Sequence, residues 1–329
     1  MRLVTYVEPY YGMDRAGFLL DGHVIDVQRS LEFALAQEDP AGARELSLAL
    51  GPPDVKEILR RGTRAHKALQ ELETRLSREA EFRRQLEGSM PHSTFREHEV
   101  HLRAPIPKPE KIIHTAGNFR EHAQEGSAAG WEFPMPHWLS FLKSPTAIIG
   151  PYDPIVKPRH TKMLDHEIEV GIVIGKRGKY IPKEKAWDHI AGLTVFNDVA
   201  ARDIQREEMK SGLLNFGKNM DTFAVFGPAL VTRESLPDPH NLRMELRVNG
   251  DPRQVSSTAR LSVTIPEIVE HYSWVTLEPG DIISTGTVQG VAAFRKPDPT
   301  PFFLKHGDLV ESEVEGLGCQ RNRIQDEAP

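Results

Sequence analysis

The first thirty residues consist of short apolar runs with the length of β-strands. Residues 3–7 and 17–20 are two such runs, and Asp21-Gly22 separates the second run from a third one at 23–27. An Asp-Gly pair between apolar runs is typical of a two-residue hairpin turn. The chain is therefore predicted to begin with antiparallel strands.

Between residues 31 and 87 the apolar positions change to the spacing of helices. Leu69, Leu72 and Leu76 recur at three- and four-residue intervals within the stretch 55–86, which predicts an amphipathic helix. This stretch is rich in arginine, but glutamates alternate with the arginines throughout. A solvated face with Glu–Arg pairs is therefore favoured over an RNA-binding face.

Three closely spaced prolines then interrupt the pattern. Pro105, Pro107 and Pro109 disfavour a helix and predict an extended linker. We place a domain boundary here, with a smaller, variable α+β domain over residues 1–105 and a second domain over residues 106–329.

Short strands and turns dominate beyond this boundary. Asn249-Gly250 is a second hairpin turn, and a single helical stretch is predicted over residues 200–210. Strands and helices do not alternate regularly, so a doubly wound parallel sheet is not supported and a mixed, mainly β fold is expected. The strands of this domain are predicted over residues 112–115, 147–149, 167–174, 193–196, 229–231, 243–248 and 282–284.

The composition is that of an ordinary globular protein. The 329 residues are 39% hydrophobic and 27% charged, with a formal net charge of −6, so nucleic acid is not expected as a partner. Cys319 is the single cysteine, which rules out an intrachain disulfide. The N-terminus lacks a signal-peptide pattern, and no apolar run approaches the ~20 residues of a membrane span. A cytoplasmic protein without membrane contact is expected.

Acidic residues gather at the start of one predicted strand. Asp165, Glu167 and Glu169 alternate there, and the apolar run 170–174 follows. Strand side chains alternate between faces, so these three carboxylates are predicted to share one face. Their repulsion is costly on a buried strand unless a cation neutralises it, and oxygen ligands favour Mg²⁺, Mn²⁺ or Ca²⁺. A strand end that points to solvent is the alternative.

Asp198 is a second acidic position, where a strand ends and the helical stretch begins. It could also be a plain helix N-cap. Arg202 and Gln205 follow four and seven residues later, so one helical face could carry both. An Asp198–Arg202 ion pair is the simpler interpretation of this spacing.

His122 and Glu125 are three residues apart and could share one helical face. A carboxylate beside an imidazole orients it and makes it more basic, as a general base requires. An incidental surface pair is the alternative. The glycines and prolines of residues 126–136 predict a mobile loop that could close over a site.

A Thr-Gly-Thr sequence at 285–287 follows the last predicted buried strand. Its hydroxyls and backbone amides are suited to a carboxylate ligand. A turn with a purely structural role is the equal alternative.

Taken in this order, the motifs resemble the fumarylacetoacetate hydrolase family over about residues 111–323. No single motif is decisive, but the ordered set is specific. The resemblance implies a mixed α+β, mainly β fold whose C-terminal domain is a rolled β-sandwich, usually assembled as a homodimer. The matching segments are residues 118–125, 141–143, 166–169, 197–198, 201–205, 218, 221–223, 227–228, 280–290, 304–308 and 314–318.

The resemblance also implies roles for individual residues around a divalent cation, either Mg²⁺ or Mn²⁺, with Ca²⁺ possible. Asp165 lies beside the metal-binding carboxylates but is not itself a family ligand position. The metal ligands of the family match Glu167, Glu169 and Asp198. The general-base dyad, which the family carries on a lid, matches His122 and Glu125. The residues that contact substrate or transition state match Arg202, Gln205, Lys218 and Thr287.

The implied reaction is hydrolysis of a C–C bond in a small anionic 2,4-dioxo acid, such as an acylpyruvate. His122, oriented by Glu125, would deprotonate a water, and Lys218 and Gln205 would stabilise the developing charge. A carboxylic acid and a 2-oxo acid would be released. The same metal site could instead serve decarboxylation of a 2-oxo acid, hydration of a 2-oxo-alkenoate or isomerisation. A non-catalytic binding protein that uses the arginine-rich helix is a third hypothesis.

Several residues differ from those common in the family. Phe119, Val288 and Gln289 are such departures, and the segment 126–139 is long and rich in aromatic residues. We assign these differences to the lid and to the rim of the pocket. They leave the identity of the substrate open.

Overall fold

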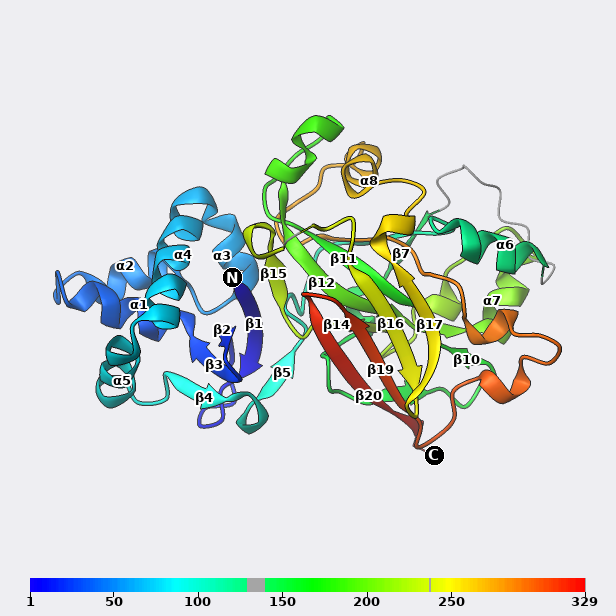
Figure 1. The fold of residues 1–329 in the computed structure, drawn as a ribbon, viewed down its shortest axis with the longest axis horizontal. Helices are drawn as coiled ribbons and strands as arrows, with labels where there is room; N and C mark the ends of the chain where they lie inside the picture. The colour runs from blue at the N-terminus through cyan, green and yellow to red at the C-terminus, as the bar shows by residue number, and fades with distance from the viewer. Residues whose placement is uncertain (129–139, 237, 329) are drawn as a thin grey trace.

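The structure is a computed structural model that describes residues 1–128, 140–236 and 238–328. Two β-sheets form its framework (Figure 1), and the predicted mixed α+β fold is confirmed. In order across the larger sheet, the strands are β4 (Thr94–Arg96), β3 (His23–Asp26), β2 (Asp14–Leu20), β1 (Arg2–Val7), β15 (Leu230–Thr232), β12 (Ile190–Asp198), β11 (Ile168–Ile174), β18 (Ile282–Ser284), β6 (Ile112–Thr115) and β7 (Ser140–Lys143).

Shorter strands extend this sheet, and a smaller sheet packs against one of its faces. The strands β5 (His101–Arg103), β14 (Ala224–Phe226) and β8 (Ile148–Ile149) attach beside the main path. The smaller sheet runs in the order β17 (Asp251–Ser257), β16 (Arg243–Val248), β19 (Leu309–Val314), β20 (Gly318–Asp326) and β9 (Ile155–Lys157), and β10 (Leu164–Asp165) pairs separately with β13 (Ala200–Ala201).

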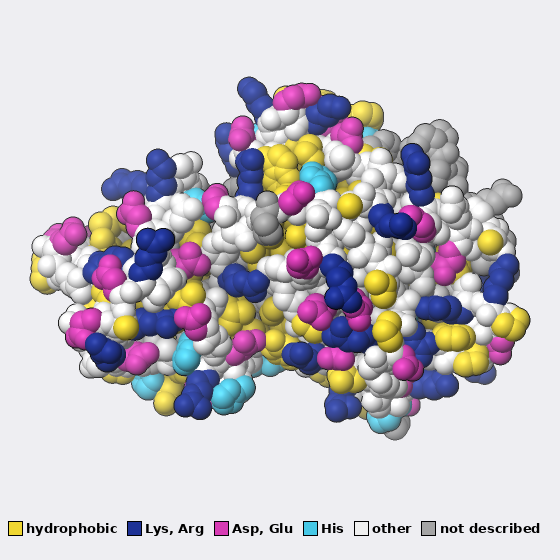
Figure 2. Space-filling view, viewed as in Figure 1, with side chains coloured by type: hydrophobic (Ala, Val, Ile, Leu, Met, Phe, Trp, Pro, Cys, Tyr) yellow, Lys and Arg dark blue, Asp and Glu magenta, His cyan; other side chains and the backbone are white. Residues whose placement is uncertain are grey.

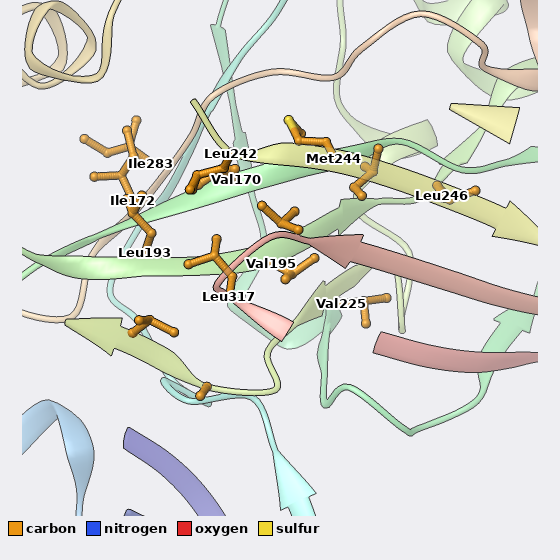
Figure 3. Close-up of a cluster of buried hydrophobic side chains, with 14 of the residues drawn as sticks. Val170, Ile172, Leu193, Val195, Val225, Leu242, Met244, Leu246, Ile283 and Leu317 are labelled. Carbon is orange, nitrogen blue, oxygen red and sulfur yellow. The ribbon is translucent and has the colours of Figure 1, made fainter. Parts of the chain in front are cut away.

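The main hydrophobic core lies between the two sheets (Figure 3). Val170 and Ile172 point into it from β11, because alternate side chains of a strand share a face. Leu246 of β16 reaches it from the smaller sheet. Each fully buried side chain of this kind contributes about 1.5–3 kcal/mol, so this core fixes β11 and its neighbours firmly.

Helices cover the other face of the larger sheet near the N-terminus. The predicted apolar positions Leu69, Leu72 and Leu76 are buried there. The predicted helix over 55–86 is instead interrupted, because Gly62 adopts a φ of 70° and Glu79 a φ of −107° with a ψ of 86°. The helices are α1 (Val27–Ala36), α2 (Ala43–Leu50), α3 (Val55–Arg60), α4 (Gly62–Arg78) and α5 (Ala80–Ser89).

The arginines of this helical region pair with acidic residues. Arg60 Nη1 lies 2.6 Å from Glu57 Oε1, and Arg84 Nη2 lies 2.5 Å from Glu81 Oε2. On the face drawn in Figure 2, acidic and basic side chains are interspersed over the helices. The predicted solvated face with Glu–Arg pairs is therefore confirmed.

The N-terminal strands continue directly into the sheet of the second half. Arg2 and Leu3 of β1 pair with Val231 and Leu230 of β15. The two predicted hairpin turns are both present, with positive φ at Asp21-Gly22 and at Asn249-Gly250. The domain boundary near residue 105 stays a prediction.

The prediction of a single helical stretch in the second half is wrong. The helix α7 (Arg202–Met209) lies within the predicted range, but α6 (Arg120–Ala128) and α8 (Ile265–Tyr272) are also present. The signal for α8 is local: Thr264 and Glu267 form a capping box, and Pro266 lies in the first turn. Among the described residues, no helix is long and apolar enough to cross a membrane.

Two of the unusual residues lie in the core rather than at the rim of a pocket. Phe119 and Val288 are both fully buried within the core between the sheets. Phe119 also forms an isolated β-bridge with Leu261. Their assignment to the pocket rim is therefore wrong, because their apolar side chains serve packing. Residues 129–139 of the predicted mobile loop lie outside the described residues.

We predict that Gly192→Ala lowers the free energy of unfolding by about 3 kcal/mol. A Cβ atom at this position of β12 would lie 2.0 Å from the carbonyl oxygen of Val231 on β15. Gly88→Ala is the matched control, because Gly88 lies in α5 with open space around it. That change is expected to stabilise the protein by up to about 1 kcal/mol. Urea denaturation measures both, and unchanged stability of Gly192→Ala would contradict the pairing of β12 with β15.

Candidate active site

All of the predicted site residues except Glu125 line one cavity where several strands end. The β11–β12 pair is antiparallel, so the start of β11 lies beside the end of β12. This register brings Glu169 of β11 close to Asp198 of β12. The cavity is lined by His114, Thr115, Ala116, Gly117, His122, Phe141, Glu167, Glu169, Asp198, Arg202, Gln205, Leu214, Lys218 and Thr287.

His114, Glu169 and Asp198 form a cluster that could hold a cation. His114 Nε2 lies 2.9 Å from Asp198 Oδ2 and 3.1 Å from Glu169 Oε2, and the three possible ligand atoms lie within 4.8 Å of one another. Burial raises the pKa of Glu169, although His114 opposes this effect. Glu169 Oε1 is buried without a hydrogen-bond partner among the described residues. An unsatisfied buried carboxylate oxygen fits a divalent cation with oxygen ligands.

The cationic side chains near Asp198 keep it ionised. Lys218 Nζ lies 2.5 Å from Asp198 Oδ2, and the ammonium of Lys143 contacts Oδ1. Burial alone would raise the pKa of Asp198, but His114 and these ammonium groups hold it well below its usual range. Burial lowers the pKa of Lys143 to about 8, against the opposing effect of Asp198. For His114, burial is outweighed by Asp198 and Glu169, which raise its pKa to about 9.

Glu167 lies between two cations rather than beside Asp165. Its carboxylate contacts the guanidinium of Arg202, and its Oε2 lies 2.7 Å from Lys218 Nζ. Glu167 and Glu169 both reach the cavity, as expected from alternation, but Asp165 belongs to β10 and does not line it. The prediction that three carboxylates share one face is therefore wrong for Asp165.

Arg202 is not paired with Asp198, and Asp198 does not cap α7. The Nε atom of Arg202 donates to Asp165 Oδ2 at 2.8 Å, and its Nη1 donates to Gln205 Oε1 at 2.9 Å. The residue at the N-cap position is Ala201. Both of the simpler interpretations of this segment are therefore wrong, because β13 separates Asp198 from the helix.

The possible general base lies on α6. His122 Nδ1 is 3.7 Å from Glu125 Oε2, and the His122 ring lies 5.3 Å from the ring of Phe294. The carboxylate of Glu125 also accepts a hydrogen bond from the backbone N–H of Gly290 at 3.0 Å. The two residues share one face of the helix, as their spacing indicates.

The hydroxyls of the Thr-Gly-Thr sequence are used within the fold. Thr287 Oγ1 donates to the carbonyl of Ile168 at 3.0 Å and accepts from Gln254 Nε2 at 3.0 Å. Thr285 Oγ1 accepts from the backbone N–H of Val170 at 3.1 Å. Thr287 still lines the cavity, but its proton is directed to β11 rather than to a ligand.

The sequence did not indicate His114, and it matched the segment 141–143 to the family without a role for Lys143. His114 follows two isoleucines and precedes Thr115 in a predicted short strand, which is a weak signal. Lys143 reaches Asp198 only because β6 and β7 pair antiparallel beside β18. Contacts of this kind depend on sheet order, which a single sequence does not show.

Comparison with known proteins establishes the class of this chain. Residues 111–325 match the family described as fumarylacetoacetate (FAA) hydrolase C-terminal, and the relatives are enzymes that act on ketonic substrates. This chain is an enzyme of that class. It belongs to the fumarylacetoacetate hydrolase family, as the ordered motifs predicted.

Three proteins illustrate the similarity. A Bos taurus protein named oxaloacetate tautomerase FAHD2A, mitochondrial, is 45% identical over 229 residues, which are 69% of this chain and 70% of the relative. The fumarylacetoacetate hydrolase from Exiguobacterium antarcticum is 30% identical, with a TM-score of 0.75 and coverage of 99% of this chain and 100% of its own. A maleylpyruvate hydrolase from Sphingobium sp. SYK-6, solved with manganese(II) and pyruvate, is 27% identical, with a TM-score of 0.68 and coverage of 100% of both chains.

We predict that Glu169→Gln weakens Mn²⁺ binding by about 100-fold or more, because the cluster loses a charged ligand. Isothermal titration calorimetry measures this affinity. Glu313→Gln is the control, since Glu313 lies on β19 with half of its side chain exposed and pairs with Arg247 away from the cavity. Equal Mn²⁺ affinity in the two variants would contradict the assignment of a cation to this cluster.

Proposed function

We propose that this chain is a divalent-cation-dependent tautomerase of oxaloacetate or of a similarly short 2-oxo dicarboxylic acid. The observation that carries this proposal is that His122 shares one buried cavity with the carboxylate cluster and with the cations Arg202 and Lys218. Keto–enol exchange needs a group that moves a proton and positive charge near the oxygen that becomes negative. The relative named oxaloacetate tautomerase supports the choice of substrate.

Glu167, Glu169 and Asp198 are the proposed ligands of the cation, with His114 beside them. Mg²⁺ and Mn²⁺ both suit a ligand set dominated by carboxylates, and the manganese of the Sphingobium hydrolase makes Mn²⁺ the first metal to test. A cation bound there would polarise the carbonyl of the 2-oxo acid as a Lewis acid.

His122 is the proposed carrier of the proton. Its Nδ1 faces the carboxylate of Glu125 at 3.7 Å, which orients the imidazole. In the direction from keto to enol, Nε2 takes a proton from C3 of the substrate and then delivers that proton to the 2-oxo oxygen. The reverse direction returns the proton to C3. The exchange consumes no water and breaks no C–C bond.

The cationic side chains hold the acid. Arg202 and Lys218 line the cavity and are fully charged at neutral pH, because nearby carboxylates outweigh burial and keep the pKa of each above its usual value. Gln205 adds an amide that is already hydrogen-bonded to Arg202. These groups can bind the two carboxylates of a short dicarboxylic acid and orient C3 toward His122.

Hydrolysis of a 2,4-dioxo acid is the second candidate. The His122–Glu125 pair could activate a water for attack on the distal carbonyl, while Lys218 and Gln205 stabilise the negative charge that develops. The structural similarity to a maleylpyruvate hydrolase supports this reaction.

Product analysis separates the candidates. With Mn²⁺ and enol-oxaloacetate, a tautomerase accelerates the loss of enol absorbance and forms no pyruvate. Pyruvate from oxaloacetate indicates a decarboxylase, and pyruvate from acetylpyruvate indicates a hydrolase; a lactate dehydrogenase coupled assay detects both. No acceleration of enol loss in the presence of Mn²⁺ would overturn the proposed tautomerase.

His122→Asn is expected to lower kcat for enol loss by about 10²- to 10⁴-fold, because the proton carrier is removed. Mn²⁺ affinity, measured by calorimetry, should stay unchanged, since His122 is not a proposed ligand. His101→Asn on β5 is the control, because His101 is half exposed and pairs with Asp153. A His122→Asn variant with the kcat of the unmodified protein would assign the proton transfer to another group.

The homodimer and the cytoplasmic location stay predictions. The name of the bovine relative places that protein in mitochondria. Light scattering of the purified chain measures its molar mass and tests the dimer.

A further inference from the structure

Asp165 is a buried carboxylate that lies outside the cavity and yet contacts segments that form it. The residue ends β10, and its side chain is fully buried. Its Oδ1 accepts from the backbone N–H groups of His166 and Ala292, both at 2.8 Å. Its Oδ2 accepts from the N–H of Ala293 at 3.0 Å and from Arg202 Nε at 2.8 Å. These four donors fill the acceptor positions of a carboxylate.

The contact between Asp165 and Arg202 helps to fix the orientation of the guanidinium. A guanidinium carries five N–H donors in a rigid planar fork. Asp165 takes the Nε–H, and the terminal nitrogens donate to Glu167 and Gln205. Asp165 therefore sets the plane of the fork together with Glu167 and Gln205, and Arg202 itself lines the cavity.

The hydrogen bonds from the N–H groups of Ala292 and Ala293 to Asp165 anchor a short 3₁₀ turn, η7 (Ala292–Phe294). Phe294 at its end lies 5.3 Å from the ring of His122 and 5.9 Å from the guanidinium of Arg202. Just before the turn, the N–H of Gly290 donates to Glu125. The turn held by Asp165 thus contacts His122, and the segment just before the turn contacts Glu125.

We propose that Asp165 is a positioning residue. It holds Arg202 and the His122–Glu125 pair in the relative positions that binding and proton transfer of an anionic 2-oxo acid require. The proposal rests on the proposed function, because it assigns Arg202 to the acid and His122 to the proton. A neutral amide cannot replace the carboxylate. In Asp165→Asn, one acceptor oxygen becomes an NH₂ group that faces N–H donors, and the charge opposite Arg202 is lost.

The experiment measures oxalate binding by calorimetry at saturating Mn²⁺, together with kcat and KM for enol-oxaloacetate. Asp165→Asn is expected to raise the Kd of oxalate about 10- to 100-fold, because a charge-assisted contact that orients Arg202 is lost. Its Mn²⁺ affinity should stay within about threefold, as expected for a residue that is not a ligand. Oxalate affinity equal to that of the unmodified protein would overturn the proposal.

Asp281→Asn is the matched control. Asp281 is also fully buried, is paired with Lys111 at 2.6 Å, and accepts backbone N–H groups from Lys111 and Glu278. It does not line the cavity. A loss of stability without a loss of oxalate affinity is expected for this variant. An equal loss of oxalate affinity in both variants would show a general effect of buried aspartates and overturn the proposal.

A second variant separates the two contacts and remains informative if Asp165→Asn does not fold. Ala292→Pro removes the N–H that Asp165 accepts, at the first position of η7, where proline is tolerated. This variant should lower kcat through the general-base pair and leave the Kd of oxalate unchanged, because the contact with Arg202 remains. An unchanged kcat would contradict the claim that Asp165 positions the His122–Glu125 pair through η7. Failure of the unmodified protein to bind oxalate with Mn²⁺ would instead overturn the proposed function itself.

Discussion

The site depends on the mutual neutralisation of charges that are buried together. Taking an ion out of water costs several kcal/mol unless an opposite charge and further hydrogen bonds compensate for it. Here each carboxylate contacts at least one cationic group, although Glu169 Oε1 has no hydrogen-bond partner among the described residues. Loss of one cationic member therefore leaves an uncompensated buried charge. The carboxylates are Asp165, Glu167, Glu169 and Asp198, and the cationic groups are His114, Lys143, Arg202 and Lys218.

The fold brings these charges together because each arrives on a separate rigid element. Antiparallel pairing places Glu169 at the start of β11 beside Asp198 at the end of β12. Parallel pairing of β6 with β18 then adds His114 to the same end of the sheet. The strands are held by apolar cores on both faces of the sheet. Packing at this density leaves little freedom for a strand to shift and relieve the charge repulsion.

The sequence predicts those parts of the site that are local. His122 and Glu125 share a helix face through their spacing, and the alternation of a strand brings Glu167 and Glu169 to one side. The role of Asp165 depends on η7, more than 120 residues away, and no local pattern encodes that contact. His114 reaches the cluster through sheet order for the same reason. Strand positions, hairpin turns and the buried face of α4 were predictable because short-range periodicity determines them.

The charges of the site also couple the binding of a cation to that of an anionic substrate. Without a bound cation, Asp198 and Glu169 raise the pKa of His114 to about 9. A divalent cation held by Glu169 and Asp198 would oppose this protonation, so its binding is expected to release a proton. The loaded cluster would still carry a net positive charge, which favours an anionic ligand. Cation and anion should therefore strengthen each other's binding by the same factor.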